Sequence, residues 1–280
     1  MRGLSFATRR LLEVCQKIVK SRAPITVRGV AYQLFVRQEI PSMAVGETQK
    51  VSRLLVYARE HDIIAWDDIV DETRAIERAA MWRDLPAFGR TVAAAYRRDY
   101  WASQPVNVQV WSEKATVGGI LRPVTEKYGV PFMAVHGFSS ATALHDAAEA
   151  SVADPRPLTI LYCGDHDPSG MYMSEVDLSD RFARYGGRVT IKRIALAAND
   201  LDGLPSFPAK PTDPRFAWYR SHFGTVAWEL DAMDPNILRD LIEGEILDYI
   251  DPTAWGRMKL VEAAEQRTVE RVAAALRDAN

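Results

Sequence analysis

In the first part of the chain, apolar residues recur every three or four positions, a spacing that predicts helices. The predicted helices cover residues 4–20, 27–37, 47–61 and 73–100. Between the last two, residues 62–71 form a turn with short extended pieces. Three helices followed by a short β element are typical of a helix-turn-helix or winged-helix module. We therefore predict a mainly helical domain over residues 1–104.

From Val106 onward, short apolar runs alternate with helical stretches. The predicted strands are 106–111, 131–136, 158–163 and 188–194, and the helices between them are 115–128, 140–151 and 170–185. This alternation indicates βαβ units and a parallel sheet. A proline-rich passage after residue 195 is interpreted as an ordered loop, and two or three helices then reach the end of the chain. The predicted fold class is α/β, with a parallel-sheet domain and a helical C-terminal extension over residues 105–280.

Charge divides the chain in the same way. Residues 1–60 hold eleven Lys or Arg against four Glu, a net charge of +7. Residues 106–280 hold eighteen basic and twenty-five acidic residues, a net charge of −7. A basic module on an acidic remainder is typical of a nucleic-acid reader, and chance clustering on solvated helix faces is the alternative. The residues singled out for DNA contact are Arg28, Arg37, Lys50 and Arg53.

The composition and the first residues indicate the cellular compartment. The first residues lack the apolar core and cleavage site of a signal peptide, and no stretch approaches the ~20 apolar residues of a membrane span. Cys15 and Cys163 are far apart without metal-ligand spacing, which predicts buried thiols in a reducing compartment. We expect a soluble, cytoplasmic protein that associates with DNA and has no membrane partner.

Three carboxylates follow predicted strands. Glu113 comes after the first strand, before Lys114, and Asp165 and Asp167 come after the third in the run G-D-H-D-P-S-G. Ligands of parallel sheets bind beyond the carboxyl ends of the strands, where these three acids would repel one another without a cation. Oxygen ligands of this kind suit Mg²⁺, with Mn²⁺ as a substitute. The alternative for each acid alone is a helix N-cap or a solvated loop residue, and His166 either contacts phosphate or points to solvent.

The order of these acids resembles the Toprim domain that topoisomerases, primases and certain nucleases share, over roughly residues 106–194. The elements S-E-K and D-x-D-P-x-G are most similar to the A subunit of type IIB topoisomerase (topoisomerase VI) and its meiotic double-strand-break relatives. That family carries an Arg-x-x-Tyr-Tyr-like motif whose second Tyr attacks DNA. Arg28 and Tyr32 stand at the matching positions, whereas Ala31 and Gly29 replace the first Tyr and the usual acid.

The resemblance implies that Tyr32 attacks a DNA phosphodiester to form a phosphotyrosyl bond, with Arg28, Glu113 and Lys114 in catalytic roles. It also implies a homodimer, because in that family the Tyr of one subunit works on the Toprim site of the other. Without a Walker-type run, ATP-driven strand passage would need a separate ATPase subunit. From the residues alone, Tyr32 is a half-buried side chain that packs beside the core, as most helical Tyr residues do.

Two other functions therefore stay open. One is a hydrolytic Toprim nuclease, in which metal-bound water attacks and Tyr32 is structural. The other is a DNA-binding subunit without activity, and a primase-type activity is a more distant alternative. Residues 228–235, W-E-L-D-A-M-D-P, are interpreted as the start of a helix without chemistry of their own.

Overall fold

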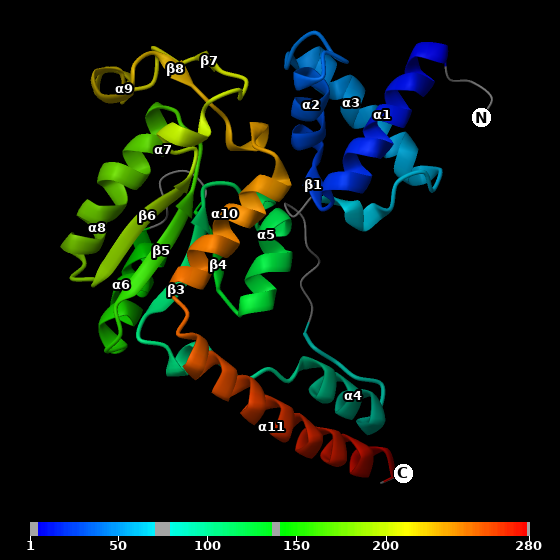
Figure 1. Cartoon of the computed structure of the whole chain (residues 1–280), viewed down its shortest axis with the longest axis vertical. Coiled ribbons are helices and arrows are strands. Elements are labelled where there is room, and N and C mark those ends of the chain that lie inside the picture. Colours follow the sequence, from blue (N-terminus) through cyan, green and yellow to red (C-terminus); the bar gives the residue numbers. More distant parts are fainter. Residues whose placement is uncertain (1–4, 71–78, 136–140, 279–280) are drawn as a thin grey trace.

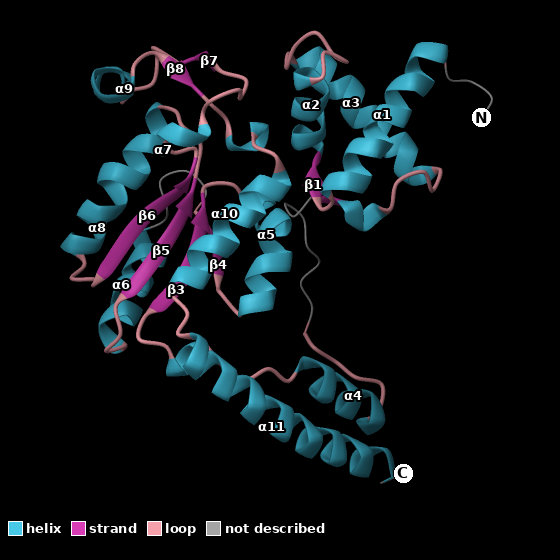
Figure 2. Cartoon of the chain, viewed as in Figure 1, coloured by secondary structure: helices cyan, strands magenta, loops and turns pink. Residues whose placement is uncertain are grey.

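The computed structural model describes residues 5–70, 79–135 and 141–278, and Figure 1 traces them from end to end. The predicted elements 4–20, 62–71, 73–100, 131–136 and 140–151 each include residues outside the described ranges, namely residues 4, 71, 73–78, 136 and 140. A helical unit lies at one end of the molecule, a sheet with helices on both faces occupies the middle, and a pair of helices extends from the other end (Figures 1 and 2).

The N-terminal unit contains the three predicted helices, α1 (Phe6–Arg22), α2 (Val27–Val36) and α3 (Val45–Glu60). Their apolar stripes form a common core of Leu12, Cys15, Ile18, Val30, Leu34, Val51 and Leu55. In the described residues, β1 (Ile25–Thr26) pairs in parallel with β2 (Ile69–Val70). The β element of this unit is therefore a parallel pair that joins the connection between α1 and α2 to the end of the unit, whereas a wing is an antiparallel hairpin.

The predicted parallel sheet is confirmed. Its strands are β3 (Asn107–Ser112), β4 (Phe132–Ala134), β5 (Leu158–Cys163) and β6 (Val189–Ala195), in the order β4-β3-β5-β6, and every pair is parallel. The chain leaves β3 toward one side, forms β4, and then crosses to the other side for β5. The strand order thus reverses between β3 and β5, which is where open α/β sheets bind their ligands.

Helices cover both faces of this sheet. On one face lie α5 (Ala115–Tyr128) and α10 (Pro235–Asp248), and on the other lie α6 (Ala141–Ala153) and α8 (Leu178–Arg184) (Figure 1). Every residue of β5 is buried, as expected for a central parallel strand with two covered faces. The stretch predicted as one helix at 170–185 is α7 (Pro168–Tyr172), a π-helical turn (Met173–Asp177) and α8.

The proline-rich passage after β6 contains a short strand, β7 (Phe207–Pro208), which pairs antiparallel with β8 (Val226–Ala227). The helices predicted after this passage are α9 (Phe216–Phe223), α10 and α11 (Pro252–Asp278). Trp228 forms an isolated antiparallel bridge with His166, which places this segment beyond the carboxyl ends of the strands (Figure 1). We call residues 207–228 the cover segment.

The helix α4 (Leu85–Ala95) packs along α11 (Pro252–Asp278), far from the N-terminal unit (Figure 1). The Tyr96 hydroxyl donates to Glu265 at 2.5 Å and fixes the pair. The helix α4 lies before the domain boundary predicted at 104/105, but it packs against the C-terminal extension, which lies after that boundary. Short 3-10 turns connect other elements at Trp66–Asp68, Trp101–Ser103, Ala198–Asp200 and Leu230–Ala232. None of the described helices combines the length and apolar character that a membrane crossing requires.

Polar contacts hold the N-terminal unit against the segment before α10. Arg22 donates to Asp234 at 2.6 Å, and the Arg239 guanidinium donates to the carbonyl oxygens of Arg22 and Pro24 at 3.1 and 3.3 Å. Thr26 caps α2 by accepting from the Gly29 amide at 2.8 Å. These contacts bring the N-terminus of α2, which carries Arg28 and Tyr32, to the edge of the sheet where the predicted carboxylates lie.

Candidate active site

The three predicted carboxylates lie at the ends of β3 and β5, and backbone amides orient each of them. Glu113 Oε1 accepts from the Asp165 amide at 3.1 Å, and Asp165 Oδ1 accepts from the Leu230 amide at 2.7 Å. Asp167 Oδ1 caps α7 by accepting from the Gly170 amide at 2.7 Å. These hydrogen bonds fix the carboxylates that are the candidate ligands for a cation.

Gly170 allows the loop after β5 to fold tightly. A Cβ at this position would lie 2.3 Å from the carbonyl oxygen of Asp165 and 3.2 Å from Glu113 Oε2. A side chain there would therefore displace the backbone that carries Asp165. Gly170 is therefore needed for the ends of β3 and β5 to approach one another this closely.

Burial and nearby acids disfavour the charged form of two of the three carboxylates. Burial and then the charge of Asp165 raise the pKa of Glu113 to about 8. The pKa of Asp167 is also raised, first by burial and then by Asp165 and Asp213, while its backbone hydrogen bonds oppose the shift. Such shifts are expected where carboxylates are desolvated near like charges, and a bound cation would reverse them.

Lys114 supplies positive charge inside the crevice. Its ammonium nitrogen lies 2.9 Å from Asp165 Oδ1 and 2.9 Å from Asp231 Oδ2. Burial alone would lower the pKa of Lys114, but these two carboxylates raise it, so the side chain stays charged. With Arg28 and Asp213, these residues line an open crevice of about 380 Å³ beneath the cover segment.

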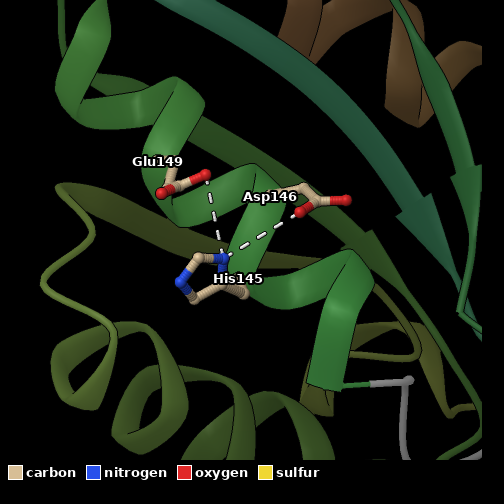
Figure 3. A group of neighbouring side chains, drawn as sticks. All are labelled: His145, Asp146 and Glu149. Atoms are coloured by element: carbon tan, nitrogen blue, oxygen red, sulfur yellow. Dashed lines mark ion pairs between the residues drawn. The ribbon is translucent and has the colours of Figure 1, made fainter.

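The donor chemistry of Glu113, Asp165 and Asp167 fits a hard divalent cation, which prefers carboxylate oxygens and retains waters. The ligand atoms of these three carboxylates do not all lie within 4.8 Å of one another. In the described residues, the group that meets this distance is His145, Asp146 and Glu149 on α6. There His145 Nδ1 is 3.9 Å from Asp146 and 3.8 Å from Glu149, and all three side chains are exposed (Figure 3). Exposed charges at this helical spacing pair with one another without a metal.

Tyr32 is more deeply buried than predicted. Its side chain has no exposed surface, and its hydroxyl lacks a hydrogen-bond partner in the described part of the chain. Phe207 of the cover segment packs edge-on against the ring at 6.1 Å, and the Arg28 guanidinium lies 5.7 Å from the ring centre. Burial and the charge of Glu229 raise the pKa of Tyr32, whereas Arg28 acts in the opposite direction. In this conformation the hydroxyl is covered and protonated.

Arg28 links the N-terminal unit to the crevice. Its Nε donates to Glu229 Oε2 at 2.7 Å and lies 3.8 Å from Asp231 Oδ2. Because Asp231 also contacts Lys114, a continuous chain of ion pairs runs from Arg28 to Asp165 within one subunit. The family resemblance predicts that Tyr32 serves the partner's carboxylates, whereas here Arg28, one helical turn before Tyr32, borders the crevice of its own chain.

The other residues predicted to contact DNA lie away from the crevice. Arg37 is the exposed residue that ends α2, at the opposite end from Arg28. Lys50 and Arg53 lie on the outer side of α3, where Lys50 pairs with Glu47 at 2.6 Å. The structure therefore does not gather these four residues into one cluster, and only Arg28 among them borders the carboxylates.

The W-E-L-D segment contributes chemistry that the sequence interpretation missed. Glu229 holds Arg28, and Asp231 accepts from Lys114 at 2.9 Å and from the Thr26 hydroxyl at 3.2 Å. The sequence does contain a signal for these two residues. Two acids stand at positions i and i+2 just before a helix, in a chain with three other candidate carboxylates. They belong to the site because the loop before α10 folds back over the ends of β3 and β5.

Arg193 on β6 is a second residue that was missed. Its Nη2 donates to the carbonyl oxygens of Gly164 and Asp165 at 2.6 and 2.7 Å, and its Nη1 donates to the Ser174 hydroxyl at 2.9 Å. The guanidinium thereby holds the loop that carries both aspartates. The signal in the sequence was a pair of adjacent cations, Lys192 and Arg193, inside a predicted strand, where alternation directs one of them inward.

His166 is buried and is not among the residues that line the crevice. It is 4 % exposed, and its Nδ1 lies 2.7 Å from the Tyr219 hydroxyl. Burial, followed by the nearby charge of Arg193, lowers the pKa of His166 to about 4. The alternative that His166 points to solvent is therefore wrong, because the cover segment closes over it, and a contact with phosphate stays a prediction.

Comparison with protein-family models, with curated proteins and with solved structures finds no match to this chain.

Proposed function

We propose that this chain cleaves DNA phosphodiester bonds at the carboxylate crevice with the help of a divalent cation, Mg²⁺ or Mn²⁺. The observation that carries the proposal is that Glu113, Asp165 and Asp167 follow β3 and β5, at the strand ends where the strand order reverses, and that the Glu113 carboxylate accepts from the Asp165 amide. When bound, a cation at such a site offsets the negative charge that develops on a phosphate under attack.

The surrounding residues support this chemistry by holding charge in place. Lys114 keeps an ammonium group between two carboxylates at the wall of the crevice, where a phosphate oxygen can approach it. Arg193 and Gly170 fix the backbone on which Asp165 and Asp167 stand. A preorganised set of charges of this kind needs little rearrangement when substrate binds.

For the nucleophile, the environment of Tyr32 favours water. The Tyr32 hydroxyl is fully covered, and its pKa is raised above its ordinary value, so it is neither accessible nor deprotonated. Hydrolysis at the crevice requires no change around Tyr32. We therefore propose a metal-dependent nuclease as the primary function, with Tyr32 in a structural role.

Transesterification by Tyr32 is the second candidate, and one observation favours it. The Tyr32 hydroxyl is a buried polar group without a hydrogen-bond partner in the described residues, and the neighbouring cation, Arg28, lines the crevice. Such a group costs stability, and groups of this kind cluster at functional sites. The reaction would require Phe207 and the Arg28–Glu229 pair to move aside.

End-labelled and supercoiled DNA, incubated with the protein in Mg²⁺ or Mn²⁺ and stopped with SDS, tests both candidates. We expect Asp165→Asn to reduce cleavage by about 100-fold or more, because it removes a charged ligand. The matched control is Asp146→Asn, which changes an exposed acid on α6 and should cleave like the wild type. Full cleavage by Asp165→Asn would refute the proposal.

Digestion with protease before electrophoresis separates the two nucleophiles. Free DNA ends that persist in Tyr32→Phe would support hydrolysis. Protein-linked DNA that disappears in Tyr32→Phe would establish transesterification and contradict the structural role of Tyr32.

A further inference from the structure

The surface helix α9 of the cover segment carries an unusual concentration of aromatic residues. Its sequence, F-A-W-Y-R-S-H-F, holds five rings in eight residues. Tyr219 points inward and is fully buried, with its hydroxyl donating to the Val226 carbonyl at 2.6 Å. Trp218, His222 and Phe223 instead remain at the surface, together with Tyr172 of α7. We call these four residues the α9 aromatic face.

The rings of this face are ordered by contact with one another. Trp218 lies 4.9 Å from His222 with an angle of 33° between the rings, and 5.1 Å from Tyr172 in an edge-on arrangement. Phe223 packs beside them, 5.7 Å from Trp218, and is 37 % exposed. The face is therefore rigid and partly open to solvent, which lowers the entropy cost of binding a further ring.

The α9 aromatic face and the carboxylate crevice share the cover segment. Phe207, Lys210 and Trp228 of this segment line the crevice, and α9 lies between them in the chain. Phe223 of α9 packs 5.4 Å from the ring of the buried His166, and Trp228 pairs with His166 through two backbone hydrogen bonds of 2.9 Å. The rings that could stack on bases are therefore held by the same segment that covers the crevice.

Charge on this segment suits a polyanion. Residues 207–224 contain Lys210, Arg215 and Arg220 against Asp213, a net charge of +2, within a region of the chain whose net charge is −7. Arg220 is exposed on α9, and Lys210 lines the crevice. A basic segment with interleaved aromatic rings is the composition that binds single strands, where rings stack on bases and cations follow the backbone.

We propose that the α9 aromatic face stacks unpaired bases next to the bond to be cleaved, so that the preferred substrate is single-stranded or frayed DNA. This inference rests on the proposed function, which it deepens by specifying the substrate. In an intact duplex the base faces are already covered by their neighbours, so exposed aromatic rings discriminate in favour of unpaired strands.

Binding without cleavage tests the inference. The affinity of the protein for a fluorescent oligothymidine and for a hairpin duplex is measured by anisotropy in EDTA. Trp218→Ala should raise the Kd for the single strand by about 5- to 150-fold, which corresponds to the ~1–3 kcal/mol of one stacked base. Trp82→Ala is the matched control, because Trp82 is also partly exposed but lies beside α4, far from the crevice.

Three further variants exclude a folding defect and a simple charge effect. Trp218→Phe preserves a ring and should retain most of the affinity, and Phe223→Ala should reproduce the loss from a more exposed position. Because stacking releases no counterions, Trp218→Ala should leave the salt dependence of binding unchanged, whereas Arg220→Ala should make it shallower. Equal wild-type affinity for both DNAs, or equal losses for Trp218→Ala and Trp82→Ala, would overturn the inference.

The cleavage proposal can fail separately. Asp165→Asn should still prefer the single strand, whether or not the wild type cleaves DNA. If the wild type shows no cleavage but Trp218 governs single-strand binding, only the cleavage proposal fails. If cleavage occurs and Trp218→Ala binds single strands normally, only the stacking inference fails.

Discussion

Replacing Gly170 by Ala is the most direct probe of the loop that carries the aspartates. The new Cβ would lie 2.3 Å from the Asp165 carbonyl oxygen, whereas carbon–oxygen contacts in proteins lie at about 3.3 Å or more. The backbone must therefore move by about 1 Å, and overpacking of this kind costs about 1–3 kcal/mol. The shift also moves the Asp165 carboxylate relative to Glu113, so cleavage should fall further than the unfolded fraction explains.

Gly244→Ala is the matched control, because Gly244 lies within α10 and a Cβ there has nothing within 4 Å. Ala favours a helix over Gly by about 0.5–1 kcal/mol, so this variant should be more stable than the wild type. Both glycines are helical, and the difference between the two variants therefore isolates the clash. Urea unfolding followed by circular dichroism measures it. If Gly170→Ala is as stable as Gly244→Ala, the tight approach of the loop to the strand ends is refuted.

Three further changes test other parts of the site and the fold. Arg193→Met removes charged hydrogen bonds to a buried loop and should cost about 2–4 kcal/mol in urea unfolding, so a loss below ~0.5 kcal/mol would contradict its positioning role. The unfolded chain protonates His166 near pH 6.5 and the folded chain only near pH 4, so the contribution of His166 to stability should fall as the pH drops through this window. Between pH 7 and 5 this contribution falls by about 2 kcal/mol, while protonation of Glu113, whose pKa is raised, acts in the opposite direction. The stability difference between the wild type and His166→Gln should therefore shift by about 2 kcal/mol over this range; the exposed His222→Gln is the control, and identical pH profiles for the two variants would refute the assignment. Asp234→Asn keeps a cap for α10 but loses the ion pair with Arg22, and should lower stability by about 1–2 kcal/mol, whereas unchanged unfolding would show that this pair does not hold the N-terminal unit.

The fold could be predicted wherever buried apolar residues recur at a regular spacing along the chain. The strand 158–163 and the helix 115–128 agree with β5 and α5 to the residue, because both are flanked by clear turn residues and are buried on consistent faces. The stretch 73–100 was less accurate. Its helix covers only Leu85–Ala95 in the described residues, and it ends at Tyr96, where the chain turns toward α11.

The candidate site was predictable in part. Glu113, Asp165 and Asp167 were found because a carboxylate directly after a parallel strand has only one edge of the sheet to occupy. Asp231 and Arg193 were not, because one lies in a loop and the other inside a strand, and neither position indicates its partners. Tyr32 was expected at the border of its helical stripe, but Phe207 of the distant cover segment buries it completely.

The sequence by itself therefore determined the elements, the parallel sheet and the edge of that sheet where the acids gather. These features follow from the spacing of apolar residues and from the alternation of strands and helices, which act over a few residues. Only the tertiary structure decided that α2 meets the W-E-L-D segment, that α4 packs on α11, and that α9 lies beside the crevice. Those contacts join segments far apart in the chain, and they depend on complementary shape and charge that no local pattern records.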